Sequence, residues 1–509
     1  MTLISRVLGL VRDVVIANMM GAGASADAFF FANKIPNFLR RLFAEGAFAQ
    51  SFVPVLSEYH QNDIDNQTQE TRKLIAQVSG TLGVIVTIVT LIGMIASPVI
   101  VIIFGPGFFM ESMQESAGER FTLASSLLKI TFPYLWFISF TALAGAILNT
   151  YGKFAVASFT PVLLNVCIIS MAIWGSDWFV NPEYALAWGV FLGGLVQFIF
   201  QLPFLYKSGA LVKPKWGWKT PGVTKIRKLM APALFGVSVT QINLLIDTQI
   251  ATLLEQGAVS FLYYADRLLE FPLGLFGIGI ATVILPSLAK LHTKKSNDEF
   301  SSTLDWGIKI INLLGWPALA GLMVLAQPII MVLFMRGEFT QLHVMQVAMA
   351  LFAYLSGLVS FMFIKILAPG YYARQDTKTP VKIGIKAMIA NMAFNIMLAP
   401  FFGYVGLAIA TTLSASLNAY WLYQGLKSQQ VYQLSTATKI FMTKVICSSI
   451  LMAYVVYWLS PSFDNWLLMS TFEQISQLII CILSGAFCYF VSIILLGVRT
   501  SDFKVMKAR

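Results

Sequence analysis

Charged side chains are scarce in this sequence. Only 12% of its 509 residues are charged and 57% are hydrophobic, and the mean hydropathy is +0.74. A soluble domain carries about a quarter charged residues. The low charge content therefore excludes an ordinary soluble protein. No stretch is long and polar enough to form a soluble domain beside the membrane part. We expect an integral membrane bundle.

Cysteine and histidine are also few. All four cysteines lie within apolar stretches, which is typical of small buried hydrophobes rather than of disulfides or metal ligands. The three histidines do not cluster, so the sequence predicts no zinc, haem or nucleophile site and no catalytic residue. A Walker motif is absent too, so energy would come from an ion gradient or from the membrane potential. The cysteines are Cys167, Cys447, Cys481 and Cys488.

Long apolar stretches dominate the chain instead. A transmembrane helix needs about 20 mainly apolar residues, and about fourteen stretches meet this requirement. Because these runs are long and do not alternate, a closed barrel is excluded, and the expected fold class is an all-α polytopic membrane protein. The first stretch is not expected to be a cleavable signal peptide, because it carries Arg6, Arg12 and Asp13. The candidate spans are roughly 1–20, 26–56, 74–104, 121–148, 155–174, 184–206, 229–254, 258–289, 306–334, 341–370, 380–401, 404–426, 440–459 and 472–497.

The basic residues between these spans predict the orientation. Nearly all of them fall on one side of the expected membrane, and only Arg120 and Arg336 fall on the other. Positive residues gather on the cytoplasmic side, so both termini are expected there. The net charge of +11 mostly reflects this distribution over many short loops, and it does not indicate a nucleic-acid partner.

An internal repeat divides the chain into lobes. RDVVIA (12–17) resembles IDTQIA (246–251), and the segment 133–161 resembles 353–380 in the same order. Spans one to six therefore resemble spans seven to twelve. Because that number is even, the two lobes should be related by an axis along the membrane normal, as parallel repeats are. Two such lobes around a central cavity favour a transporter that alternates access by rocking.

The repeat sets the expected domain boundaries. Residues 207–228 form the longest basic connection, in which Trp216 and Trp218 stand among lysines. This pattern fits a segment at the cytoplasmic interface, and a simple linker explains it equally well. The expected parts are an N-terminal lobe (1–206), the linker (207–228), a C-terminal lobe (229–426), two extra spans (440–497) and a tail (498–509).

Charge inside the membrane concentrates in the first, second and eighth expected spans. Each such charge costs about 2.5–3.5 kcal/mol at the bilayer centre, so it must be compensated. Internal salt bridges would do this, and Arg267 and Glu270 can pair at three-residue spacing. The alternative is a hydrated cavity whose arginines bind an anion, since the guanidinium fork suits phosphate oxygens. Intramembrane charge is functional by default, which favours the second interpretation.

A second polar set lies in the C-terminal half. Asp247, Asn391, Asn395 and Thr411 would give oxygen ligands to a small cation such as sodium. Hydrogen bonding between helices explains Asn and Thr at these places slightly better.

Several long segments identify the chain as resembling a known family. They are SRVLGLVRD (5–13), GAGASADAFFFANKIPNFLRRLFAEGAFAQSFVPVLSEY (21–59), LLKITFPY (127–134), GAILNTYGKF (145–154), YYADRLLEFPLG (263–274) and LAPGYYARQDTKTPVKI (367–383). They resemble the MurJ (MviN) lipid II flippases, which belong to the multidrug/oligosaccharidyl-lipid/polysaccharide (MOP) exporter superfamily. The resemblance covers nearly the whole chain.

This resemblance implies a function and a site. The cargo would be lipid II, the undecaprenyl-diphosphate-linked peptidoglycan precursor, moved from the inner to the outer leaflet of the bacterial inner membrane. Its diphosphate would meet the arginines, and its tail would lie in a groove formed by the last two spans. Expected partners are lipid II, membrane lipids and cell-wall synthesis or division proteins. The matching cavity residues are Arg6, Arg12, Asp13, Asp27, Asn37, Arg40, Glu45, Arg267 and Glu270.

Two other functions stay open on the sequence. A related exporter would carry another polyprenyl-linked glycan or drugs, although a drug exporter would favour carboxylates over an arginine cluster. A membrane scaffold for cell-wall enzymes would not need Arg12 or Arg267 at all.

Overall fold

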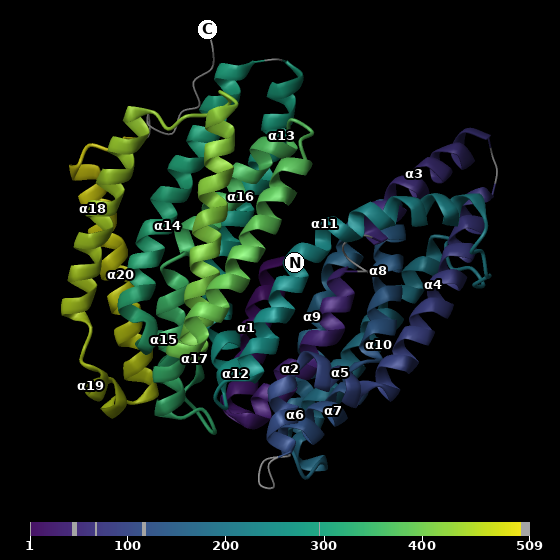
Figure 1. Ribbon diagram of the computed structural model, residues 1–509, viewed down its shortest axis with the longest axis horizontal. Helices are drawn as coiled ribbons and strands as arrows, with labels where there is room; N and C mark the ends of the chain where they lie inside the picture. Colours follow the sequence, from purple (N-terminus) through teal and green to yellow (C-terminus); the bar gives the residue numbers. More distant parts are fainter. Residues whose placement is uncertain (1, 43–47, 67–68, 114–118, 295, 500–509) are drawn as a thin grey trace. The chain divides into compact units, whose positions relative to one another are not determined.

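The computed structural model is helical throughout the part of the chain that it describes (Figure 1). It describes residues 2–499 apart from 43–47, 67–68, 114–118 and 295, and no strand occurs among these residues. A helix satisfies every backbone N–H and C=O within its own segment, which the hydrocarbon interior requires. The predicted all-α class is therefore confirmed.

The helices up to the middle of the chain are α1 (Thr2–Met20), α2 (Ala24–Leu39), α3 (Phe48–Asn66), α4 (Glu70–Ile95), α5 (Ser97–Phe104), α6 (Pro106–Ser112), α7 (Glu119–Thr131), α8 (Tyr134–Thr150), α9 (Phe154–Trp174), the short η2 (Ser176–Trp178), α10 (Glu183–Lys207) and α11 (Pro221–Thr252). The later ones are α12 (Ala258–Pro272), η3 (Leu273–Ile278), α13 (Gly279–Thr293), α14 (Asn297–Phe334), α15 (Gln341–Leu355), α16 (Leu358–Tyr372), α17 (Lys378–Ser428), α18 (Thr436–Leu459), α19 (Phe463–Leu468) and α20 (Thr471–Leu495).

The number of membrane spans is only partly settled. Among the described residues, nine helices are long and apolar enough to cross a membrane, or ten if the bent pair α15 and α16 forms one span. The expected spans at 1–20 and 229–254 correspond to α1 and α11, which are not among these helices. In α1, three charged residues lower the hydropathy on which such a count depends. The count of about fourteen therefore stays a prediction.

The chain forms two compact units, which are described separately. The first contains Met1–Ser260 and Arg336–Phe339, and the second contains Phe261–Met335 and Thr340–Arg509. The lobe limits that the repeat predicts, on either side of residues 207–228, stay a prediction.

In the first unit, α9 packs against α1, α8 and α10, and α7 packs against α2. A core that includes the fully buried Phe52, Leu56 and Leu148 lies where α3, α4 and α8 meet. Burying such side chains removes apolar surface from contact with polar groups and fixes the helix positions through close packing. The contacts with α9 and α7 hold α1 and α2, the helices that carry Arg12 and Asp27, in place.

The segment between α10 and α11 is fixed to α4. The Lys215 amide donates to the Ala76 carbonyl at 2.7 Å, and the Gly217 amide donates to the Thr81 hydroxyl at 3.1 Å. A Cβ atom on Gly80 would lie 2.2 Å from the Lys215 carbonyl oxygen, so only glycine permits this approach. Residues 208–220 therefore form a docked segment, and residues 221–228 belong to α11. The predicted place of 207–228 at the cytoplasmic interface is not tested.

In the second unit, α18 and α20 pack against α14 (Figure 1). Buried Val445 and Met452 of α18 and Cys481 of α20 form part of their shared core. The Tyr489 hydroxyl donates to the Leu313 carbonyl of α14 at 2.7 Å. The two helices outside the predicted repeat are thus packed into the core of the second unit.

Two irregular places interrupt the helices of the second unit. After Pro272 the chain forms the π-helical turn η3, because proline has no N–H to continue the α-helical ladder. In α17, Gly403 has φ 56° and ψ −138°, so the two expected spans 380–401 and 404–426 are joined at a sharp kink. A side chain is strained in this conformation, which glycine adopts readily.

Gly403 offers a test of this kink. No atom lies within 4 Å of the place where its Cβ would be, so Gly403→Ala tests backbone conformation alone. We expect the substitution to lower the free energy of unfolding by about 1–3 kcal/mol, measured by thermal unfolding of the detergent-purified protein. The control is Gly384→Ala, which has equal space but lies in regular helix and should not destabilise. Equal stability of the two variants would contradict the kink.

Candidate functional site

Arg12 of α1 is held by two side chains. Its Nε and Nη2 atoms donate to Asp13 Oδ1 at 3.0 and 2.7 Å, and its Nη1 atom donates to Asn165 Oδ1 at 3.1 Å. Asn165 lies on α9 and donates in turn to the Ser5 carbonyl at 3.2 Å. The Asp13 side chain is almost fully buried, whereas 13% of the Arg12 side chain is exposed. Asp13 and Asn165 therefore hold the Arg12 guanidinium in one orientation, and part of the side chain remains accessible to a ligand.

Asn165 is a site residue that the sequence does not reveal. It is 5% exposed and belongs to an apolar helix, where a single asparagine is typical of packing. A Cβ atom on Gly9 would lie 3.9 Å from Asn165 Nδ2, an ordinary van der Waals contact, so Gly9 lies beside the amide without being required by it. Arg6, also on α1, is half-buried and has no ion pair with any residue in the described ranges.

The end of α2 brings Asn37 and Arg40 together. Arg40 Nε donates to Asn37 Oδ1 at 3.1 Å, and Asn37 Nδ2 donates to the Asn33 carbonyl at 2.8 Å. Asn37 thereby links the guanidinium to the helix backbone. Glu45, the remaining candidate of this stretch, lies outside the described residues.

Asp27 of α2 lies in a closed network. Its carboxylate is fully buried and accepts from the Gly257 amide at 2.7 Å, from the Ser260 amide at 2.8 Å and from the Ser260 hydroxyl at 2.6 Å. Arg120 Nη1 donates to it at 3.2 Å. Asp27 therefore satisfies backbone donors at the start of α12, as an N-capping carboxylate does.

Arg120 completes this network from α7. The sequence places it among the few basic residues on the side away from the cytoplasm, which stays a prediction, and the structure shows that its side chain is only 3% exposed. Its Nε donates to Glu111 Oε2 at 2.6 Å, and its guanidinium lies 4.8 Å from the centre of the Phe108 ring. A buried carboxylate is stable only with a cation nearby. This requirement explains why Arg120 is buried beside Asp27.

In the second unit, Arg267 and Glu270 of α12 form the ion pair that their spacing predicts. Arg267 Nη1 donates to Glu270 Oε2 at 3.1 Å, and Nη2 donates to the Tyr263 hydroxyl at 3.2 Å. The guanidinium also lies 5.0 Å from the centre of the Tyr263 ring. The two side chains of the pair are 35% and 47% exposed, so this arginine remains accessible to a ligand.

The predicted cation ligands are engaged in hydrogen bonds. On α17, Asn395 Nδ2 donates to Asn391 Oδ1 at 3.0 Å, and Asn391 Nδ2 donates to the Thr411 hydroxyl at 3.4 Å. Asp247, in the first unit, accepts from Asn243 Nδ2 at 3.4 Å. Among the described residues, no group of three or more His, Cys, Asp and Glu side chains is placed to hold a metal ion.

Known proteins resemble this chain over almost its full length. Residues 16–476 match the family described as "Lipid II flippase MurJ". A "Probable lipid II flippase MurJ" from Vibrio cholerae serotype O1 is 60% identical over 505 residues, covering 99% of this chain and 96% of the relative. A "Lipid II flippase MurJ" from Burkholderia cenocepacia is 39% identical over 509 residues, covering 99% and 97%.

Solved structures agree with this result. The chain is similar to "Lipid II flippase MurJ, inward closed conformation", with a TM-score of 0.80, 27% identity and 96% of each chain covered. It is also similar to an inward-facing multidrug resistance MATE transporter of the MOP superfamily, with a TM-score of 0.68 and 84% and 95% covered. At 16% identity, the second likeness shows the fold alone.

The buried network around Asp27 predicts a large loss of stability on neutralisation. Asp27→Asn keeps the shape of the side chain and removes the charge that faces Arg120. Because an amide accepts less well from the Gly257 and Ser260 amides and leaves Arg120 with Glu111 as its remaining carboxylate, we expect the free energy of unfolding to fall by about 1–3 kcal/mol or more, measured by thermal unfolding in detergent. The matched control is Glu58→Gln, which breaks the exposed pair with Lys225 and should cost under about 1 kcal/mol. Similar values for both variants would show that the network contributes little.

Proposed function

We propose roles for the intramembrane charges from one premise: this chain belongs to the MurJ family of lipid II flippases. It is a transporter rather than an enzyme, its fold is that of the MOP superfamily, and it lies in the bacterial inner membrane. Its substrate is lipid II, the lipid-linked precursor of peptidoglycan, so it serves cell-wall synthesis. Which residues bind the cargo, what drives transport and where the termini lie belong to the proposal.

The cargo poses a defined physical problem. Its diphosphate is an anion that must leave water and cross the membrane interior, where an uncompensated charge is costly. Its polyprenyl tail stays in lipid. We propose that both termini face the cytoplasm and that transport proceeds by alternating access, with the diphosphate compensated by protein cations along the way.

The observation that carries this proposal is the setting of Arg12. A planar guanidinium binds phosphate oxygens well only when its plane is fixed. Asp13 and Asn165 fix that plane on two sides, and part of the side chain stays exposed. Asp13 also balances much of the charge, which favours release of the cargo as well as binding. Asn165 is thus proposed as a positioning residue for Arg12.

Arg267 is proposed as the corresponding arginine of the second unit. Glu270 and Tyr263 hold it through two different nitrogens, and over a third of its side chain is exposed. Arg6, which has no ion pair within the described residues, adds a positive charge that a phosphate would compensate. Arg40 is proposed for the same role, with Asn37 as its support.

Asp27 is proposed to position helices rather than to contact the cargo. It is fully buried, and its oxygen atoms accept from Arg120, Gly257 and Ser260. A contact with cargo would require this network to open.

Coupling to sodium or to the membrane potential stays a prediction. Hard cations favour oxygen ligands that include carboxylates. Asn391, Asn395 and Thr411 offer only neutral groups, and they hydrogen-bond to one another. Within the second unit this arrangement supports packing rather than a cation site, so any sodium dependence would have to involve Asp247.

Removing either arginine is expected to abolish transport. Charge-assisted hydrogen bonds contribute about 1.5–3 kcal/mol each, so Arg12→Ala and Arg267→Ala should each reduce transport at least about tenfold. The measurement is growth of cells that depend on the variant, together with protein level and the fraction of lipid II on the outer leaflet. The control is Lys225→Ala, which removes an exposed basic residue paired with Glu58. Normal growth of both arginine variants would favour a scaffold role over an anion site.

Substitution of Asp247 tests whether sodium takes part in transport. We expect Asp247→Ala to remove any sodium dependence of lipid II transport in reconstituted vesicles, since no other carboxylate belongs to the predicted ligand set. Glu58→Gln, which changes an exposed carboxylate, should keep that dependence. If transport by the unaltered protein is the same at all sodium concentrations, Asp247 is a packing residue and the cation prediction is wrong.

A further inference from the structure

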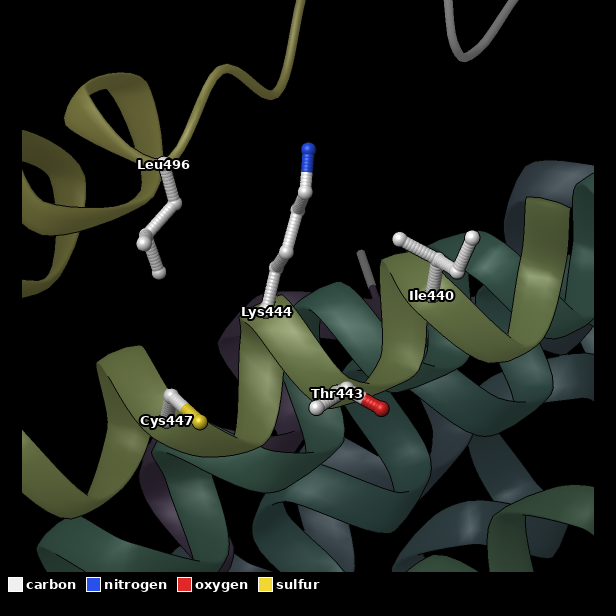
Figure 2. A pocket seen from close by; sticks show the side chains of 5 residues that line it. All are labelled: Ile440, Thr443, Lys444, Cys447 and Leu496. Atoms are coloured by element: carbon white, nitrogen blue, oxygen red, sulfur yellow. The ribbon is translucent and has the colours of Figure 1, made fainter.

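A groove lies beside the first half of α18, next to the end of α20 (Figure 2). It has a volume of about 300 Å³ and is lined by Ile440, Thr443, Lys444, Cys447 and Leu496. Figure 2 shows the Lys444 side chain extended away from α18, with its amine standing between Ile440 and Leu496. A smaller recess of about 90 Å³ shares Ile440 and Lys444 and adds Lys309 of α14. Both recesses are therefore lined by the same lysine.

The groove combines apolar walls with uncompensated positive charge. Ile440 and Leu496 are apolar lining residues, and both are exposed. Lys444 is half-buried, and no carboxylate in the described part of the chain forms an ion pair with it. A half-buried ammonium beside apolar side chains is stabilised by an anion that can share its surroundings.

Asp305, the carboxylate of α14 that pairs with Lys309, is already engaged. Asp305 forms an ion pair with Lys309 at 3.2 Å, and it accepts from the Thr438 hydroxyl at 2.6 Å and from the Tyr432 hydroxyl at 2.9 Å. Burial and the neighbouring Asp305 raise the pKa of Tyr432, so this hydroxyl keeps its proton and continues to donate. Asp305 lines neither recess. The Asp305 carboxylate thus links α18 to α14 and does not pair with Lys444, which remains available to a ligand.

The outer face of α18 indicates where the ligand comes from. Ile440, Ile450 and Leu451 of this helix are 54%, 63% and 48% exposed, and α18 is long and apolar enough to span the membrane. Such a face meets lipid chains. A molecule that reaches the groove from this side is a lipid, and the lysine selects one with an anionic headgroup.

We propose that this groove binds one anionic glycerophospholipid of the surrounding membrane, with its phosphate on Lys444 and part of an acyl chain over Ile440 and Leu496. Inorganic phosphate would leave these apolar walls in water, and the groove is too small for a headgroup of two sugars and a peptide. The proposal concerns a bound membrane lipid and does not rest on the assignment of Arg12 or Arg267 to the cargo.

The test measures lipids that stay bound to the purified protein. The full chain is incubated in detergent with equal amounts of phosphatidylglycerol and phosphatidylethanolamine, and bound lipids are counted by native mass spectrometry. We expect phosphatidylglycerol to be retained preferentially, Lys444→Gln to reduce its retention about fivefold, and Lys444→Arg to restore it. The control is Lys439→Gln, an exposed lysine of the same helix that does not line the groove.

Four outcomes would overturn the proposal. Equal retention of the two lipids, or unchanged retention in Lys444→Gln, would show that no anionic headgroup is selected there. Displacement of phosphatidylglycerol by undecaprenyl diphosphate would make the groove part of the cargo path, and displacement by inorganic phosphate alone would make it a simple anion site. Arg12→Ala keeps phosphatidylglycerol bound if the two sites are independent, which separates this proposal from the cargo assignment.

Discussion

An ion inside the membrane must be compensated by a partner, and the polar residues of both units are arranged around this requirement. The protein meets it in two ways. Asp27 and Arg120 are sealed among donors and acceptors and face no open space. Arg12 and Arg267 have carboxylate partners too, but their side chains stay partly exposed. The sealed pair holds helices together, and the exposed arginines are the ones proposed to meet a passing anion.

The part of this arrangement that depends on local spacing could be predicted from the sequence. The all-α class follows from long apolar runs, and the pair of Arg267 and Glu270 follows from the helical repeat. The partners that come from distant segments could not be predicted. Asn165 is 153 residues from Arg12 and Arg120 is 93 residues from Asp27, so no spacing rule connects them. Asn165 has the pattern of a packing residue, and Arg120 has the pattern of a loop charge.

Helix boundaries show the same division between local and distant information. The only sign of the kink in the sequence is the glycine at position 403, because no other residue pattern indicates its positive φ. α1 has too much charge for a simple hydropathy criterion, and that charge is the reason for its place in the proposed function. The docking of residues 208–220 on α4 depends on Gly80, which lies far away in the chain.

The central claim is that arginines inside the membrane recognise the diphosphate of the cargo. The most direct measurement compares binding of undecaprenyl diphosphate with binding of undecaprenol, which has the same tail and no charge, to the purified protein at several salt concentrations. The account predicts that the diphosphate binds much more tightly and that this preference is lost in Arg12→Ala. Equal affinity for the two lipids would contradict it, because the tail alone would then account for recognition.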